Sequence, residues 1–306
     1  MSPYRSLLRK ILPARFLARV NHISHADDRA LDLESRLQNV TRLLLQQRYP
    51  ELTGAASDSA PIRVHEFSIY SQEGVDGLLL HIFSKIGVAR QRFVEIGCGD
   101  GRECNTANLS LNLGWSGTLI DADQLKLASA RQFYGRMLRH KSAEVNILES
   151  RLTRENVNQV VAGPGVAGEI DLLSVDIDGN DYWIWEELTI VEPRVVVVEY
   201  NASFGPEEAL AVPYDAEFDC FKAHASGFYH GASLAAVTKL GAAKGYALIA
   251  VESQGVNALF VRRDLAAGVF PALDPRSAYV PHFQRGKLMG QAEQYALIKD
   301  LELVEI

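Results

Sequence analysis

A glycine-rich stretch is the first candidate for chemistry in this chain. Residues 93–101 read FVEIGCGDG, with Glu95 in an apolar run and Gly97, Gly99 and Gly101 at every second position after it. A backbone that lies against a nucleoside needs glycine where a Cβ atom would collide or where φ is positive. The stretch therefore predicts a nucleoside-binding loop at the carboxyl end of a strand.

A second apolar run ends in Asp121. An acid in this position can hold the ribose hydroxyls of a nucleoside, and Asp123 is a second candidate for the same role. The glycine spacing differs from the dinucleotide fingerprint G-x-G-x-x-G, because Arg102 stands where the third glycine would be. The spacing disfavours an NAD site.

Acidic residues follow another apolar segment, in the sequence DIDGND at residues 176–181. Carboxylates at the end of a strand can position a substrate hydroxyl, accept its proton or bind a divalent ion. We predict catalytic roles for Asp176 and Asp178. The alternative is a polar loop in which Asn180 or Asp181 caps the next helix.

Polar residues at the end of the adjacent strand extend this prediction. Asp176, Glu199 and Asn201 would together form an oxygen-rich Mg²⁺ site, and hydrogen bonding to a substrate is the alternative that we favour. Asn201 is accordingly also a candidate catalytic residue. His230, at the entrance of a predicted helix, is a candidate general base, with a structural histidine as the alternative.

Alternating strand and helix patterns predict how these residues are positioned. They indicate an α/β fold with a doubly wound, mostly parallel sheet. The last two strands surround the turn-like residues 253–256 and predict an antiparallel hairpin at the edge of the sheet. The predicted strands are 92–96, 117–121, 143–147, 170–175, 194–199, 246–251 and 257–261. The predicted helices are 72–86, 103–112, 124–138, 153–161, 181–188 and 231–244.

The chain divides into three predicted parts: an N-terminal helical extension with a linker (1–62), the main domain (63–270) and a C-terminal extension (271–306). Residues 1–20 are basic and amphipathic, which predicts contact with a membrane surface or a partner, or packing on the chain itself. Residues 28–48 carry a short a/d seam, which predicts a homodimer contact or a docked helix. The C-terminal extension would cover the site or contact another subunit.

Composition excludes several classes. The net charge of −7 disfavours nucleic-acid binding. No apolar run approaches the length of about 18 residues that a transmembrane helix needs. Three cysteines form no CxxC pair, so we predict no zinc site and a cytoplasmic location.

Further motifs surround the candidate residues in a fixed order. They are YSQEGVDG at 70–77, NT at 105–106, GWSG at 114–117 and DLLSVDIDG at 171–179. Over roughly residues 66–262 the chain resembles the FkbM-type class I S-adenosylmethionine-dependent methyltransferases. The resemblance implies a Rossmann-like fold, S-adenosylmethionine as methyl donor, and O-methylation of a sugar or another hydroxyl-bearing small molecule or glycan.

The resemblance also implies site residues. By position, the residues that would contact or support the cofactor are Gln72, Glu95, Gly97, Thr106 and Asp121. Asp176 would reach the pocket. Gly99, Gly101 and Asn146 complete the predicted cofactor-binding set. Other functions stay open: an N- or C-methyltransferase, an NAD-dependent oxidoreductase, and a non-catalytic scaffold that binds through its N-terminal helices.

Overall fold

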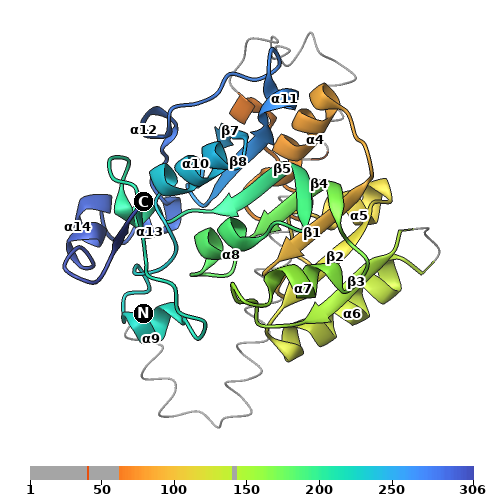
Figure 1. The fold of residues 1–306 in the computed structure, drawn as a ribbon, viewed down its shortest axis with the longest axis horizontal. Coiled ribbons are helices and arrows are strands. Elements are labelled where there is room, and N and C mark those ends of the chain that lie inside the picture. The colour runs from red at the N-terminus through yellow and green to blue at the C-terminus, as the bar shows by residue number, and fades with distance from the viewer. Residues whose placement is uncertain (1–39, 41–61, 140–142) are drawn as a thin grey trace. The chain divides into compact units, whose positions relative to one another are not determined.

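The computed structural model describes residue 40 and residues 62–139 and 143–306 (Figure 1). The chain divides into two compact units, Met1–Ser59 and Ala60–Ile306, and the fold described below belongs to the second. The predicted segments 1–20 and 28–48 lie outside the described residues, apart from the helical Val40. In the part of the chain that is described, no helix is long and apolar enough to cross a membrane.

A seven-stranded sheet forms the centre of this unit, in the order β3-β2-β1-β4-β5-β8-β7 (Figure 1). The first five strands of this order are parallel, and β8 is antiparallel to both of its neighbours. The strands are β1 (Arg92–Ile96), β2 (Ser116–Asp121), β3 (Val145–Glu149), β4 (Gly168–Val175), β5 (Val191–Glu199), β7 (Tyr246–Val251) and β8 (Asn257–Arg262).

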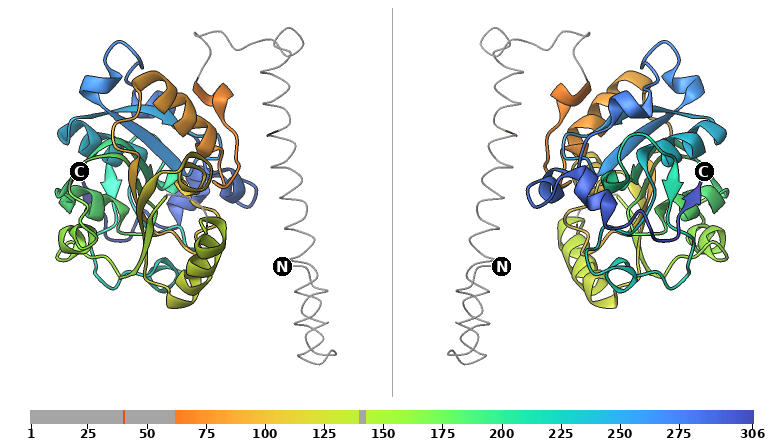
Figure 2. Two further views of the ribbon diagram at one scale, coloured as in Figure 1. Left: turned by 90° about the vertical axis from the view of Figure 1, so that its right-hand side faces the viewer. Right: turned by 90° about the vertical axis from the view of Figure 1, so that its left-hand side faces the viewer.

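Helices cover both faces of the sheet (Figure 2). Alternate residues of a strand point to opposite faces, and in β5 Val196 and Val198 join one buried cluster while Val195 and Val197 join the other. The first cluster includes residues of α7 (Val157–Ala162), α8 (Asp181–Glu187) and α10 (Leu234–Ala243). The second includes residues of α4 (Val75–Ile86), α5 (Ala107–Leu113) and α6 (Gln124–Met137). The Rossmann-like, doubly wound prediction is confirmed.

The predicted antiparallel hairpin at the edge of the sheet is confirmed: β7 and β8 pair with each other, and β8 lies between β5 and β7. One detail differs from the predicted sheet. Strand β3 begins and ends two residues later than the predicted 143–147, which moves Asn146 to the start of the strand.

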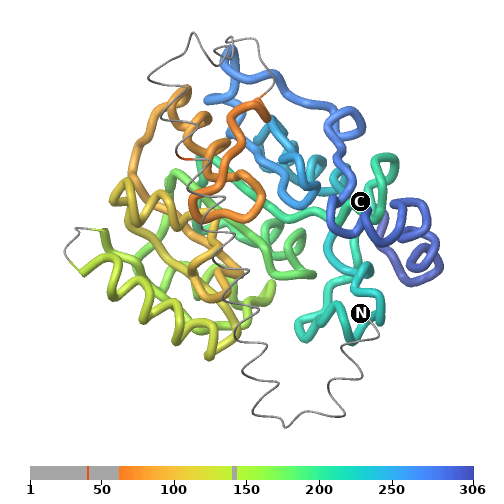
Figure 3. The backbone as a smooth tube through the Cα atoms, turned by 180° about the vertical axis from the view of Figure 1, so that it is seen from behind, coloured from red at the N-terminus to blue at the C-terminus, as the bar shows by residue number. Residues whose placement is uncertain are grey.

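The C-terminal segment packs against the chain that follows β5, and the two lie side by side in Figures 1 and 3. Strand β9 (Val304–Glu305) pairs with β6 (Leu210–Ala211), and a small apolar cluster joins Phe204 and Val212 to Ile298. The remaining short helices of the described residues are η1 (Ile62–His65), η2 (Ala202–Phe204), α9 (Cys220–Ala223), α11 (Arg263–Ala266), α12 (Pro275–Ala278), α13 (Phe283–Gly286) and α14 (Gln291–Ala296). The C-terminal segment thereby lies close to the end of β5.

Candidate functional site

The order of strands places the candidate residues at one edge of the sheet. The chain runs from β1 outward through β2 and β3, then returns on the other side of β1 with β4. Ligands of such sheets bind outside the carboxyl ends of the strands where the order reverses. The loops after β1 and β4 meet there, because Asp176 N donates to Ile96 O at 3.0 Å. We call the edge formed by these carboxyl ends the rim.

The three glycines after β1 serve different purposes. A Cβ atom on Gly97 would lie 1.5 Å from Asp176 O, and one on Gly101 would lie 2.9 Å from Tyr134 Cε2. Those two glycines allow the loop to approach β4 and α6. Gly99, with φ +55°, would place a Cβ atom in open space, with no heavy atom of another described residue outside its chain neighbours within 4 Å. Of the three, Gly99 is the one that borders space a ligand can fill.

Asp121 lies beside that open space. Its Oδ2 accepts a hydrogen bond from Gly99 N at 2.7 Å, and its Oδ1 accepts one from Asp123 N at 2.8 Å. A carboxylate offers about four acceptor positions, so Asp121 can still accept from two hydroxyls. Asp123 caps α6 by accepting from Leu125 N and Lys126 N. The ribose-binding prediction therefore fits Asp121 better than Asp123.

Glu95 and Thr106 support the loop from inside. The buried Glu95 carboxylate accepts hydrogen bonds from Asn105 N, Thr106 N and the Thr106 hydroxyl. Burial raises the pKa of Glu95, and these hydrogen bonds oppose that shift. Both side chains are used within the protein, so they position the backbone near Gly99 rather than face a ligand.

The segment before α4 brings further polar groups to the rim. The exposed Gln72 donates to Glu103. Asp76 is buried and accepts from the backbone N–H groups of residues 69–71, which shapes the turn that presents Gln72 and Glu73. Burial, followed by the charges of other glutamates, raises the pKa of Glu73 to about 7. Sequence reasoning did not select Glu73, although it lies inside the YSQEGVDG motif.

Asn146 lies away from the glycine loop. It is exposed, it is the second residue of β3, and its register partner is Thr118, three residues before Asp121 on β2. The residue of β3 opposite Asp121 is Glu149. The cofactor role of Asn146 stays a prediction that this register does not favour, because Glu149 and not Asn146 lies opposite Asp121 at the rim.

Three acids converge where β4 and β5 end. One carboxylate oxygen from each of Asp176, Asp178 and Glu199 lies within 4.8 Å of the others, and we call these residues the acid cluster. Asp181 shapes the loop by accepting from Ile177 N at 2.7 Å and Gly179 N at 2.9 Å. Asp178 is exposed and has φ +55°, a left-handed conformation that aspartate tolerates better than most residues.

Electrostatics at the rim favour a bound cation. Burial raises the pKa of Asp176 well above its usual range, and the nearby Glu199 raises it further. Burial also raises the pKa of Glu199, as do Asp181 and Asp178, whereas Arg285 opposes the shift. Ionised carboxylates this close repel one another, so a positive ligand would stabilise their charged forms.

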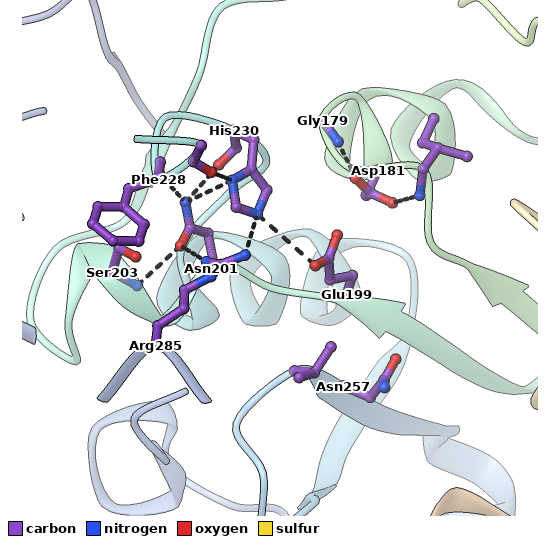
Figure 4. A network of polar contacts seen from close by, with 12 residues as sticks. Gly179, Asp181, Glu199, Asn201, Ser203, Phe228, His230, Asn257 and Arg285 are labelled. Atoms are coloured by element: carbon purple, nitrogen blue, oxygen red, sulfur yellow. Dashed lines mark hydrogen bonds and ion pairs between the residues drawn. The ribbon is translucent and has the colours of Figure 1, made fainter. Parts of the chain in front are cut away.

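Asn201 is fully engaged within the protein (Figure 4). Its Nδ2 donates to Phe228 O at 2.6 Å and His230 O at 2.8 Å. Its Oδ1 accepts from Ser203 N at 2.9 Å and Arg285 Nη1 at 3.1 Å. Both ends of the Asn201 amide are occupied within the protein, so its roles as a metal ligand and a substrate contact stay predictions that these contacts do not favour.

His230 is buried with a defined tautomer. Its Nδ1 donates to Gly227 O at 2.9 Å, since a carbonyl can only accept. Its Nε2 lies 3.3 Å from Arg285 Nη2, which can only donate, and 3.8 Å from Glu199 Oε1. Burial, followed by the Arg285 charge, lowers the pKa of His230 to about 4. The general-base role of His230 stays a prediction, and in this structure the lone pair of its Nε2 faces the Arg285 guanidinium.

Arg285 was not selected from the sequence. It lies in α13, a helix of four residues, and no motif surrounds it. Its side chain reaches Asn201 and His230 from the C-terminal segment, as Figure 4 shows. The C-terminal extension therefore contributes a charged group to the site.

The Arg285 contact has a measurable consequence. In NMR titrations of the imidazole ring, we expect the pKa of His230 to be about 4 in the wild type. It should be higher in Arg285→Gln but stay below its ordinary value of about 6.5, because burial, the larger cause of the shift, remains. The unfolded chain takes up the proton at higher pH than the folded chain does. His230 therefore lowers stability as the pH falls from about 6.5 to about 4.

Arg276→Gln is the matched control, because Arg276 is an exposed arginine of the same segment. It should leave the His230 titration unchanged. A wild-type pKa of His230 near 6.5, or equal titrations in the wild type and Arg285→Gln, would contradict the geometry described above.

Comparisons with known proteins identify similar solved structures. No protein-family model matches the sequence, and no curated protein matches it. Magnesium protoporphyrin IX methyltransferase (ChlM) from Synechocystis PCC 6803, solved with bound SAH, is 14% identical with a TM-score of 0.40, over 61% of this chain and 81% of that chain. The O-methyltransferase from Bacillus cereus, solved in complex with SAH, is 18% identical with a TM-score of 0.40, over 65% and 82%.

The [4+2]-cyclase SpnF is also similar, at 13% identity and a TM-score of 0.37, over 70% of this chain and 74% of that chain. Likenesses at these identities and TM-scores assign no chemistry to this chain. Its function has to be inferred from its own residues.

Proposed function

We propose that this protein is an S-adenosylmethionine-dependent methyltransferase that methylates a hydroxyl group of a sugar or another small molecule. The observation that supports this most is the open space at Gly99, which Asp121 borders at the point where the strand order reverses. The motif order shared with the FkbM-type methyltransferases supports the same donor.

The charge at the rim suits this donor. S-adenosylmethionine carries a positive sulfonium, and the acid cluster lies next to the glycine loop through the contact between Gly97 and Asp176. Carboxylates near the sulfonium would attract the donor, while Asp121 would accept from its ribose hydroxyls. A neutral or negative nucleoside would gain less from this environment.

The exposure and the basicity of the residues of the acid cluster indicate how the methyl acceptor would be bound. Asp178 is exposed and can hold a hydroxyl by a hydrogen bond, whereas Asp176 and Glu199 lie deeper. Because the pKa values of both deeper acids are raised, either one is a stronger base than an ordinary carboxylate when ionised. We assign the hydroxyl to Asp178 and its proton to Asp176 or Glu199. Alignment of acceptor and donor would supply much of the rate.

Four further assignments remain predictions. They are the cytoplasmic location, the membrane contact through residues 1–20, the homodimer contact through residues 28–48, and the division into parts 1–62, 63–270 and 271–306.

Ligand binding followed by product analysis tests the proposed function. We expect calorimetry to show binding of S-adenosylmethionine and no binding of NAD. Incubation with a labelled methyl donor and candidate glycans should give a labelled ether, detected by mass spectrometry. Binding of NAD alone would overturn the proposal in favour of an oxidoreductase. Binding of S-adenosylmethionine with no transfer to any acceptor would favour a non-catalytic scaffold.

Substitution of Asp121 tests the donor site directly. Asp121→Ala should weaken S-adenosylmethionine binding by about 1–3 kcal/mol, the scale of lost hydrogen bonds to a charged group. Asp123→Ala is the matched control, because it removes the same charge two residues away and costs α6 only its cap. The control should lose about 1 kcal/mol of stability and keep its affinity. Equal affinities in both variants would rule out Asp121 as the ribose contact.

A further inference from the structure

We propose that Asp176, Asp178 and Glu199 bind one divalent metal cation, with Asn257 as a fourth oxygen donor. The proposal deepens the proposed function, on which only the catalytic use of the cation rests. It differs from the ligand set expected from the sequence, because Asp178 takes the place of Asn201.

The positions of the oxygens suit a hard cation. Three carboxylate oxygens, one from each acid, lie within 4.8 Å of one another. Ca²⁺ binds oxygen at about 2.3–2.6 Å, so oxygens on opposite sides of the ion are about 4.6–5.2 Å apart. Mg²⁺, at about 2.0–2.1 Å, requires about 4.0–4.2 Å, which a small movement of the exposed Asp178 would provide.

An independent observation comes from Asn257 on strand β8. Asn257 is 2% exposed, and its Oδ1 has no hydrogen-bond partner among the described residues. Asn257 is the register partner of Glu199, so the two side chains start from the same face of the sheet with Cβ atoms about 4.5–5.5 Å apart. Figure 4 shows the two residues on neighbouring strands at the rim.

The unpaired Asn257 oxygen needs a positive or donating partner. A buried acceptor without one costs about 1–3 kcal/mol. A cation held by Glu199 would satisfy this oxygen directly or through a bound water. The orphaned amide therefore indicates a ligand at the same place as the acid cluster.

The charged groups around the acid cluster also favour the binding of a divalent cation. Among the described residues, the Asp176 carboxylate has no hydrogen bond or ion pair, and Glu199 has only its contact with His230 at 3.8 Å. Arg285 contributes one positive charge close to Glu199 and Asp178. The carboxylates of the acid cluster, with Asp181 beside them, outnumber the one guanidinium, and a divalent cation would offset part of this excess of negative charge.

A cation here would also serve methyl transfer. A hydroxyl coordinated to a divalent cation loses its proton more readily than a free hydroxyl. Asp178 is the exposed member of the acid cluster, so an acceptor would approach from its side.

Binding of Mn²⁺ to chelator-treated protein without S-adenosylmethionine tests the proposal. Free Mn²⁺ is measured by its electron paramagnetic resonance signal, and Mg²⁺ and Ca²⁺ are added as competitors. We expect one Mn²⁺ per chain, displaced by either competitor. Asp178→Asn should weaken binding by about tenfold or more, as should Glu199→Gln. Asn tolerates the left-handed backbone at position 178, so that variant should fold.

Glu192→Gln is the matched control. Glu192 is exposed and lies at the opposite end of β5 from Glu199, so the change removes one carboxylate far from the acid cluster. It should change Mn²⁺ affinity by no more than about twofold. No stoichiometric Mn²⁺ binding in the wild type, or equal affinity in Asp178→Asn and Glu192→Gln, would overturn the proposal. Because the donor is absent from this experiment, the result is separate from the test of the methyltransferase function.

Discussion

Gly99→Val should abolish S-adenosylmethionine binding while the domain stays folded. Apart from its chain neighbours, no described residue has a heavy atom within 4 Å of the Cβ position of Gly99. The larger side chain would therefore occupy the space that we propose for the donor instead of clashing with the described part of the protein. We expect affinity to fall by about a hundredfold or more, equivalent to about 3 kcal/mol. Calorimetric titration with S-adenosylmethionine measures the loss.

Gly87→Val is the matched control for backbone strain. Gly87 has φ +72° and open space at its Cβ position, as Gly99 does, but it ends α4 before β1 begins, at the opposite end of that strand from the glycine loop. Both variants should lose a similar amount of stability, about 1–3 kcal/mol, because valine is strained at positive φ. Only Gly99→Val should lose the donor. Normal binding by Gly99→Val would show that the open space is not the donor site.

Gly97→Ala should have the largest effect on stability. The added Cβ atom would lie 1.5 Å from Asp176 O, a backbone atom of the neighbouring strand end, and φ at this position is +86°. The loops after β1 and β4 would have to separate, which breaks the contact at the centre of the sheet. We expect a loss of about 4 kcal/mol or more, measured as the free energy of unfolding in urea.

Gly135→Ala is the control, because its expected change in stability has the opposite sign. Gly135 lies inside α6, and a Cβ atom there would meet nothing within 4 Å. Alanine in a helix interior should stabilise the protein by about 0.5–1 kcal/mol relative to glycine. If Gly97→Ala were as stable as the wild type, the close approach between the two loops would be wrong.

Much of the sheet could be predicted because strong local signals mark its strands. Strand β1 was placed correctly at residues 92–96 because an apolar run lies between the exposed Arg92 and Gly97. The nearly continuous apolar run of β5 likewise indicated a strand buried on both faces. The edge strand β3 is only partly buried, so its apolar pattern is weak, and the predicted bounds were shifted by two residues.

The proposed donor side of the site rests on local sequence motifs, whereas the proposed acceptor side depends on contacts between distant parts of the chain. Gly99 and Asp121 lie in motifs whose spacing implies their role, but the sequence cannot show that Gly97 and Gly101 serve backbone and helix packing. Arg285 contacts Asn201 across 84 positions of the chain, and no local pattern encodes such a pair. Asn257 begins a strand and becomes notable only through its register with Glu199.

The direction of β8 gives the proposed metal site a residue that follows directly after a hairpin turn. Because β8 runs antiparallel, its first residue, Asn257, lies at the rim beside the last residue of β5. The turn before it is held by Glu252, which accepts from the backbone N–H groups of Gln254, Val256 and Asn257. A hairpin turn can change length and sequence without disturbing the crossover helices that position Gly99 and Asp121. If Gly99 and Asp121 hold the donor as proposed, evolution of this fold could change the acceptor by altering a surface turn and leave the donor-binding residues unchanged.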